Sequence, residues 1–192
     1  MAEISPQAPR SCGSCSLCCK LLSVPEFDKP GNVWCPHAKR DTGGCAIYLT
    51  RPNGCRRFMC NWLKDSALDD KWKPDRCSII VSRSNGGRGL RISVDPDEKD
   101  AWRREPFYAQ IKEWSRATPA GTGYVAVFTG EKCFVVFPEE DLEVSYIKPG
   151  SGLRVGYLEN ENGRQPIAQV HYADGSMKEF RGAHYPSLAS AS

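Results

Sequence analysis

The cysteines between positions 12 and 60 are the residues of this 192-residue chain best suited to chemistry. Eight of its ten cysteines fall in this stretch, namely Cys12, Cys15, Cys18, Cys19, Cys35, Cys45, Cys55 and Cys60. Thiols that only fill a core have no reason to cluster, because other small hydrophobic side chains serve equally well. A disulfide framework, a metal site and redox catalysis are the three interpretations that compete.

The spacing of these cysteines favours metal ligation. A Cys-x-x-Cys unit turns two thiolates towards one point, and a metal ion takes about four such donors. Cys12, Cys15 and Cys18 repeat that spacing twice. The run is similar to the three-cysteine run of bacterial ferredoxins, except that Cys19 follows at once. Adjacent side chains diverge, so Cys18 and Cys19 indicate either two interleaved sites or one site with a cysteine left over.

The expected cellular compartment and the net charge help to decide between the interpretations of the cysteines. The first residues lack the basic start and apolar stretch of a secretory signal, and no run approaches the roughly 20 apolar residues of a membrane span. We therefore expect a cytoplasmic protein without a membrane partner. Disulfides are rare in the reducing cytosol, so metal ligation is preferred over a disulfide framework. The net charge of +3 is too small to favour a nucleic-acid partner.

Basic residues lie next to several of the cysteines. Arg51, Arg56 and Arg57 surround Cys55, and Lys20 follows Cys19 directly. A positive field of this kind favours thiolate over thiol, although ordinary solvated basic residues explain the same pattern. His37 is a further candidate for a ligand or a hydrogen-bond donor, but a surface histidine in a turn is the simpler interpretation.

The same stretch carries a family resemblance, in a motif that spans residues 12–62. It reads Cys12-x-x-Cys15-x-x-Cys18-Cys19, then Cys35-Pro-His37, Cys45-Ala-Ile-Tyr48, Arg51-Pro52, Cys55-Arg56, Phe58 and Cys60. This motif resembles the CxxCxxCC family, which is described as a zinc- or iron-chelating domain and has some members labelled iron–sulfur oxidoreductases. The resemblance implies that the eight cysteines chelate metal, and it implies no established reaction. Residues 72–192 show no resemblance that we recognise.

Little regular structure is predicted for the elements that must position the cysteines. Residues 12–70 form a predicted module that is rich in Gly and Pro and has little apolar periodicity. Such a module needs stabilisation from elsewhere, and a structural zinc supplies on the order of 10 kcal/mol. Short helices are predicted near residues 16–22 and 56–63, and a turn at Pro52-Asn53-Gly54 presents Cys55. The predicted apolar shell consists of Ile47, Tyr48, Phe58 and Trp62.

Residues 71–186 read as a β-rich part. The predicted strands are 78–82, 90–94, 124–128, 133–137, 153–158, 167–172 and 177–180. Turns of the hairpin type are predicted at residues 85–87 and at Asp174-Gly175. Cys77 and Cys133 stand in apolar stretches and are predicted to be buried core thiols in strands.

Helices and flexible ends complete the prediction. Asp97 is expected to cap a turn that runs to Trp102, and Pro106 to open a helix with Phe107, Ile111 and Trp114 on one face. Residues 1–11 and 187–192 are expected to be flexible. The fold class is α+β: a cysteine-rich, metal-stabilised N-terminal module packed on an antiparallel β-rich part with one or two helices.

The function expected from these features is metal binding. We favour zinc over an iron–sulfur cluster, with up to two sites per chain, in a structural, metal-handling or metal-sensing role. A closed all-cysteine site leaves no open position for hydrolytic chemistry. Two alternatives stay open: an iron–sulfur electron-transfer enzyme, and a zinc module that contacts nucleic acid or protein. The residues that motivate the last one are Arg51, Arg56, Arg57, Phe58 and Trp62.

Overall fold

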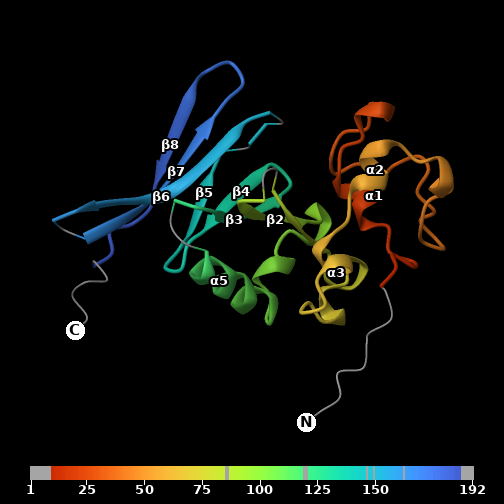
Figure 1. The fold of residues 1–192 in the computed structure, drawn as a ribbon, viewed down its shortest axis with the longest axis horizontal. Coiled ribbons are helices and arrows are strands. Elements are labelled where there is room, and N and C mark those ends of the chain that lie inside the picture. The colour runs from red at the N-terminus through yellow and green to blue at the C-terminus, as the bar shows by residue number, and fades with distance from the viewer. Residues whose placement is uncertain are drawn as a thin grey trace, which may run out of the picture. The chain divides into compact units, whose positions relative to one another are not determined.

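The fold of the chain is α+β, with five α-helices and two sheets among the described residues (Figure 1). The computed structural model describes residues 10–84, 87–118, 121–145, 147–148, 150–161 and 163–186. The chain divides into two compact units. The first unit comprises the chain up to Ser82 together with Ser93–Ala101, and the second comprises Arg83–Ile92 and the chain from Trp102 onward.

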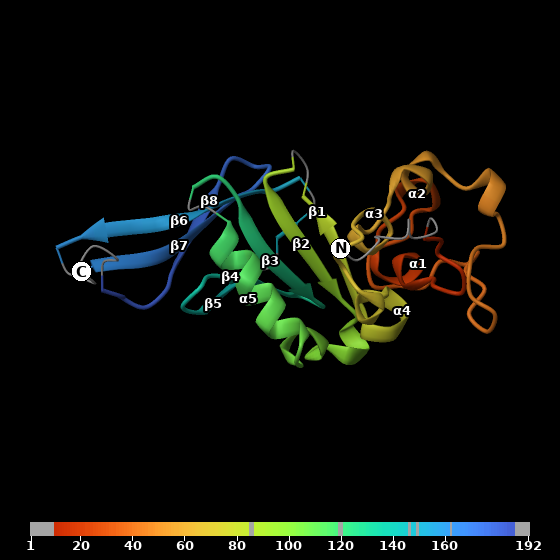
Figure 2. The same ribbon diagram turned by 60° about the horizontal axis from the view of Figure 1, so that its bottom comes forward.

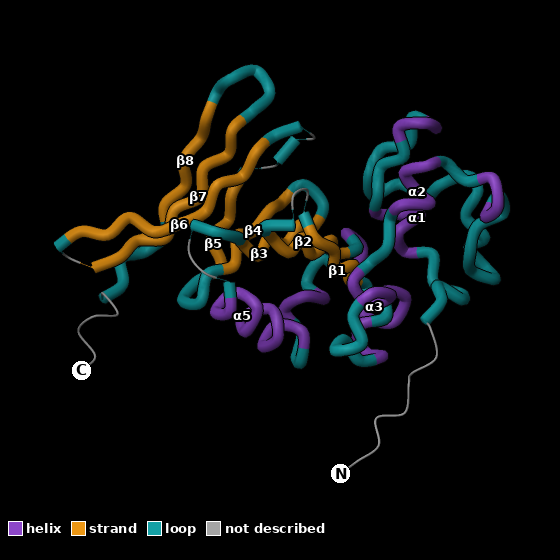
Figure 3. Tube along the Cα trace, in the orientation of Figure 1, coloured by secondary structure: helices purple, strands orange, loops and turns teal. Residues whose placement is uncertain are grey.

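The part of the first unit that precedes residue 79 is built from very short helices joined by loops, as Figure 3 shows. Its α-helices are α1 (Leu17–Leu21), α2 (Asn53–Arg57), α3 (Asn61–Lys64) and α4 (Pro74–Cys77). Helices of four or five residues are not stable alone, because nucleation costs more than so few hydrogen bonds return. The order of this unit therefore depends on contacts between its segments.

Several sequence predictions for the first unit need correction. The predicted helix near residues 16–22 is confirmed as α1, whereas the one near residues 56–63 is replaced by α2 and α3. The predicted turn at Pro52-Asn53-Gly54 is wrong: Pro52 stands at the N-cap position of α2, and Asn53 and Gly54 are the first residues of that helix. Cys77 is buried as predicted, but it ends α4 and does not lie in a strand.

The cap predicted at Asp97 is also wrong. Asp95 accepts a hydrogen bond from the Asp97 backbone N–H at 3.0 Å and caps a short 3₁₀ turn, η4 (Pro96–Glu98). A proline directly after the capping residue favours this position, because its fixed φ suits the first turn. A second 3₁₀ turn, η5 (Ala101–Arg103), follows.

The predicted strands are present, within a few residues of their expected ends. The strands are β1 (Ile79–Arg83), β2 (Gly89–Val94), β3 (Tyr124–Thr129), β4 (Lys132–Val136), β5 (Asp141–Val144), β6 (Gly152–Asn160), β7 (Gly163–His171) and β8 (Met177–Arg181). One sheet has the order β1-β2-β3-β4-β5 and the other the order β6-β7-β8. Only β5 was not predicted; its four residues include two acidic ones, which weaken the strand signal.

The core of the second unit lies between β3–β5 and the three-stranded sheet. Its buried residues are Ala126, Cys133, Val135, Phe137, Leu142, Val144 and Ala168. Cys133 is fully buried in β4, as predicted. The antiparallel β3–β4 and β4–β5 pairs place these side chains on one face. Figure 2 shows α5 (Phe107–Ala117) along β3 and β4, both of which it contacts.

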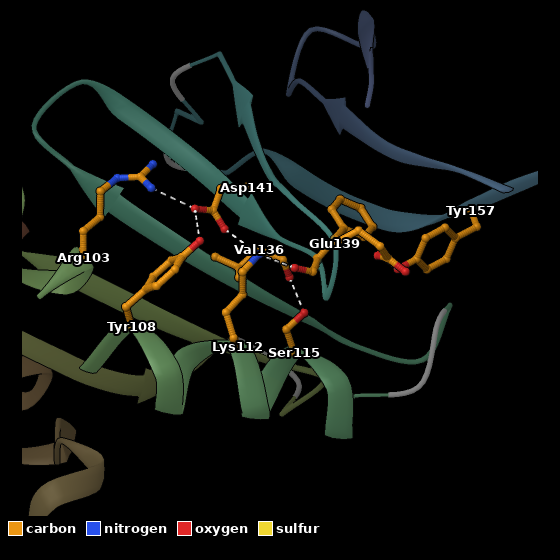
Figure 4. A network of polar contacts seen from close by, with 9 residues as sticks. Arg103, Tyr108, Lys112, Ser115, Val136, Glu139, Asp141 and Tyr157 are labelled. Atoms are coloured by element: carbon orange, nitrogen blue, oxygen red, sulfur yellow. Dashed lines mark hydrogen bonds and ion pairs between the residues drawn. The ribbon is translucent and has the colours of Figure 1, made fainter. Parts of the chain in front are cut away.

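Helix α5 presents a more polar face to the sheet than predicted. Ile111 is fully buried, but Lys112 and Ser115 are buried beside it. Lys112 Nζ donates to the Phe137 carbonyl at 2.7 Å, and Ser115 Oγ donates to the Val136 carbonyl at 2.6 Å (Figure 4). These bonds satisfy carbonyl groups at the end of β4, which explains why polar side chains occupy the face.

The remaining predictions concern the chain ends and the two hairpin turns. Most of the expected flexible segment 1–11, residues 85–86 of the expected turn and the tail 187–192 lie outside the described residues. The turn at Asp174-Gly175 is confirmed, with Gly175 at φ +85° and its N–H bonded to the Tyr172 carbonyl. Among the described residues, no helix has the length and apolar character that a membrane crossing needs.

Candidate metal centre

A single cavity in the first unit is lined by all eight clustered cysteines. Its volume is about 120 Å³, and its wall includes Cys12, Cys15, Cys18, Cys19, Cys35, Cys45, Cys55 and Cys60. All ten cysteines of the chain lie in its described part, and all are free. The fold thus gathers thiols that are up to 48 positions apart (from 12 to 60) around one space.

The first four cysteines enter the cavity from a turn and from α1. The Cys15 backbone N–H donates to the Cys12 carbonyl at 2.9 Å, which closes the turn. Cys18 and Cys19 are consecutive residues of α1. Successive residues leave an α-helix about 100° apart, but a hydrogen bond between the two side chains brings these thiols together.

Two loops bring Cys35 and Cys45 to the same wall. The Cys35 N–H donates to the Cys19 carbonyl at 2.9 Å. An isolated antiparallel bridge joins Ala38 to Cys45, so the chain between them folds back on itself. Gly43, at φ +75°, packs so closely that a Cβ there would lie 2.0 Å from the Ser14 carbonyl oxygen. Only glycine fits this position.

The last two cysteines are held by α2 and α3. Cys55 lies in α2, and Cys60 is the residue that caps α3. Arg10 anchors the start of the described chain to this region, because it donates to the Trp62 carbonyl at 2.8 Å. Its guanidinium also lies 5.0 Å from the centre of the Trp62 ring. Arg10 therefore holds the segment that carries Cys12 next to the start of α3.

The thiols perturb one another. The Cys18 thiol donates a hydrogen bond to Cys19, which raises the pKa of Cys18 and lowers that of Cys19. Burial raises the pKa of Cys15, and the charges of Asp75 and Cys60 raise it further. Burial likewise raises the pKa of Cys55 and of Cys60. Thiolates in this cavity therefore require compensation by positive charge or by a metal ion.

Lys29 is a cation that sequence reasoning missed. It is only 5% exposed, and its Nζ donates to the carbonyl oxygens of Lys20, Leu22 and Pro30. Burial lowers its pKa, and the nearby charges of Cys35 and Cys19 oppose that shift. Lys29 follows a 3₁₀ turn in a stretch without apolar periodicity, so no sequence signal marks it as buried.

Of the other basic residues predicted to act on the thiols, Arg51 does so and Lys20 does not. Arg51 lines the cavity, and its charge lowers the pKa of Cys19 together with the larger effect of the Cys18 hydrogen bond. Lys20 does not act on the thiols as predicted. It pairs at 2.6 Å with both Asp95 and Asp97, and these two carboxylates neutralise its charge.

Most residues considered for nucleic-acid contact are engaged inside the unit. Arg51, Phe58 and Trp62 line the cavity. Arg56 donates to the carbonyls of Arg51 and Leu49 at 2.9 Å. Arg56 is nevertheless exposed, so the alternative of a contact with nucleic acid or protein stays a prediction.

The remainder of the wall is mostly apolar. Ile47, Phe58 and Trp62 line the cavity as the predicted shell required, but Tyr48 is 51% exposed and does not. The indole N–H of Trp62 is buried and has no hydrogen-bond partner. A buried donor without a partner is costly, and a sulfur atom bound to metal is an acceptor that would satisfy it.

The cysteines face the cavity without forming a finished coordination shell. In the part of the chain that the structure describes, no three or more His, Cys, Asp or Glu side chains stand in an arrangement that would hold a metal ion. Binding would require the thiols to draw together. His37 also lines the cavity, with its ring 5.0 Å from that of Phe27. The donors are nevertheless of one soft type, which suits zinc or iron–sulfur chemistry.

Comparisons of the chain with protein-family models, with curated proteins and with solved structures find no match.

Proposed function

We propose that the first unit is a metal-chelating module whose ligands are the eight clustered cysteines. The observation that carries the proposal is that all eight line one cavity, although they come from five separate segments. Zinc is the preferred metal. The resemblance of residues 12–62 to the CxxCxxCC family supports the same function and is itself part of this proposal.

The construction of the unit supports a stabilising role for the metal. Its α-helices within the described residues are no longer than five residues, and loops connect them. Bonds from one ion to several segments would hold such a unit together, and a structural zinc contributes about 10 kcal/mol or more in small modules. The cysteine-rich, metal-stabilised module predicted from the sequence therefore stays the proposed architecture of this unit.

The charges around the cavity also support metal–thiolate centres. A Zn²⁺ ion with four thiolate ligands carries a net charge of −2, and an iron–sulfur cluster with four thiolates is likewise anionic. Lys29 and Arg51 lie beside the thiols and would offset part of this charge. When bound, the metal would replace thiol protons and keep the cysteines as thiolates.

An iron–sulfur protein that transfers electrons is the second candidate. The ferredoxin-like spacing of Cys12, Cys15 and Cys18 motivates it. The cavity volume of about 120 Å³ exceeds the about 10–15 Å³ that one water needs, so it leaves room for a cluster as well as for zinc ions. The apolar wall would exclude water and tune the potential of a cluster.

Elemental analysis of protein purified without oxygen, together with its visible spectrum, tests the proposal. Zinc without absorption near 400 nm would support a structural, sensing or handling role. Iron with matching acid-labile sulfide would support the electron-transfer alternative. Protein that retains no metal, takes up none from solution and is fully folded would contradict both.

A further inference from the structure

The adjacent pair Cys18 and Cys19 sets a limit on how the eight thiols are used. A zinc ion takes four thiolates, and a four-iron cluster takes four cysteines. Eight donors are therefore enough for two centres. Cys18 and Cys19 leave α1 in directions about 100° apart, and their thiols meet in a hydrogen bond, so two centres would adjoin at this pair.

We propose that the cavity holds two separate four-cysteine metal sites, and that the boundary between them falls between Cys18 and Cys19. Site A consists of Cys12, Cys15, Cys18 and Cys60. Site B consists of Cys19, Cys35, Cys45 and Cys55. This assignment rests on the proposed metal binding and deepens it, since neither the spacing nor the resemblance assigns cysteines to sites.

Backbone contacts bring the members of site A together. The turn from Cys12 to Cys15 is closed by a hydrogen bond of 2.9 Å. Arg10 fixes the chain before Cys12 to the Trp62 carbonyl, two residues after Cys60. Cys60 interacts electrostatically with Cys12 and Cys15, and Cys18 interacts with Cys12 and Cys15 as well as, more strongly, with its neighbour Cys19.

A different set of contacts gathers site B. The Cys35 N–H donates to the Cys19 carbonyl, and the bridge between Ala38 and Cys45 returns the chain towards Cys35. Cys55 interacts electrostatically with Cys19, Cys35 and Cys45. The three cysteines that act on Cys55 thus belong to the same set of four, and Glu26 is the other charged group that acts on it.

The surroundings of the two sets differ in charge. Lys29 lies near Cys19, Cys35 and Cys55, all members of site B, and also near Cys18 of site A. Asp75 acts on Cys15 in site A, where its carboxylate also accepts from Ser14 at 3.3 Å and pairs with Lys73 at 3.1 Å. A metal–thiolate centre is anionic, so site A should release its metal before site B does.

The competing arrangement is a single centre that mixes the two sets. The hydrogen bond between Cys18 and Cys19 and the close approach of Gly43 to Ser14 connect the sets. Substitution of cysteines in full-length protein distinguishes the arrangements. The variants are Cys15→Ser and Cys60→Ser for site A, Cys35→Ser and Cys55→Ser for site B, and the double variants within and across sets.

Bound metal per chain, counted by native mass spectrometry after oxygen-free purification, is the readout. Each single variant should lose half of the metal, a double variant within a set should lose no more, and a double variant across sets should lose all of it. Cys77→Ser is the matched control, because Cys77 is buried in the same unit but bonds to the carbonyls of Lys73 and Ile79. Its metal content should be unchanged.

Stepwise removal of metal from the unsubstituted protein gives a second test that does not depend on variants folding. A chelator is added in portions, exposed thiols are alkylated, and the modified cysteines are identified by peptide mass spectrometry. At half occupancy, the alkylated cysteines should be those of site A. Alkylation spread over both sets, or loss of all metal in every single variant without loss of fold, would overturn the assignment. Unsubstituted protein that binds no metal would instead contradict the proposed function.

Discussion

The interiors of the two units differ in what they contain. The second unit buries apolar residues such as Val127, Val135 and Ile111 completely, between two sheets and under a helix. Full burial of one such side chain contributes about 1.5–3 kcal/mol. The first unit also buries apolar residues, among them Ile79 and Ile80, but it surrounds a cavity with eight thiols and its helices have four or five residues.

Buried polar groups occur in both units. In the second unit, the Asp141 side chain is 7% exposed and receives Arg103, Tyr108 and Lys112 within about 3 Å (Figure 4). Buried polar atoms without a hydrogen-bond partner are found in both units, for example Trp62 Nε1 in the first and His171 Nε2 in the second. The first unit is distinguished by its cavity lined with thiols, where we propose that metal binds.

Removal of metal should produce the largest effect, and it should be confined to the first unit. A strong chelator under oxygen-free conditions should raise amide hydrogen exchange in α1 to α4, because about 10 kcal/mol of ligand bonding is lost. Exchange in β3, β4 and β7 should be unchanged. Hydrogen-exchange mass spectrometry measures both units in one experiment, and re-addition of metal should restore protection. Equal loss of protection in both units would break the comparison.

Asp141→Asn should be the most damaging polar substitution in the second unit. It would leave Lys112, whose side chain is 11% exposed, without its carboxylate partner at 3.0 Å. Removal of one partner of a buried ion pair costs roughly 3–5 kcal/mol. Urea unfolding followed by a signal from the second unit measures the loss, and the metal content should not change.

Glu143→Gln is the matched control on the same strand. Glu143 pairs with Lys132 at 3.2 Å, but both side chains are more than half exposed. An exposed pair contributes about 0–1 kcal/mol. A cost at Glu143 as large as that at Asp141 would show that burial does not decide the energetics of this unit.

The buried thiol of Cys133 should make the free energy of unfolding of the second unit depend on pH. Burial raises the pKa of its thiol to about 12 from an ordinary value of 9.0. As the pH rises, the Cys133 thiol loses its proton in the unfolded chain before it does so in the folded chain. The contribution of this thiol to the free energy of unfolding is therefore complete below pH 9 and is lost as the pH rises towards 12. The slope is about 1.4 kcal/mol per pH unit. Unfolding free energies from pH 8 to 10.5 should fall less steeply in Cys133→Ala, and identical slopes would contradict this account.

Asp75→Asn should give the smallest effect. It should change the difference in metal-release rate between the two proposed sites. Loss of a negative charge near Cys15 should slow release of metal from site A by about two- to threefold, since Lys73 already offsets part of that charge. Release from site B should be unchanged. The rates are measured by competition with a coloured chelator. Equal slowing at both sites would indicate a shared centre.

Much of the second unit was predictable from its sequence, because its strands show apolar runs bounded by turns. The strand around Cys133 and the turn at Asp174-Gly175 are examples. Strand β5 was missed because Asp141 and Glu143 obscure its alternation. Its aspartate is buried with two partners from α5, Tyr108 and Lys112, and one from η5, Arg103, and local sequence does not reveal these contacts.

The cysteines of the candidate site could be named from the sequence, but the charged residues around them could not. Cysteine spacing is a local property, so the eight positions could be named. Lys29 and Asp75 could not, because their proximity to thiols depends on contacts between loops far apart in sequence. Lys20 was misplaced for the same reason: its partners Asp95 and Asp97 lie more than 70 residues away.

The mass of the folded, full-length protein under oxygen-free, non-denaturing conditions tests the central claim most directly. The account predicts a chain that carries about two zinc ions or two clusters, with the eight cysteines of the cavity protected from alkylation. A folded chain at the mass of the bare polypeptide, with the cysteines of the cavity freely alkylated and no uptake of zinc or iron, would contradict it.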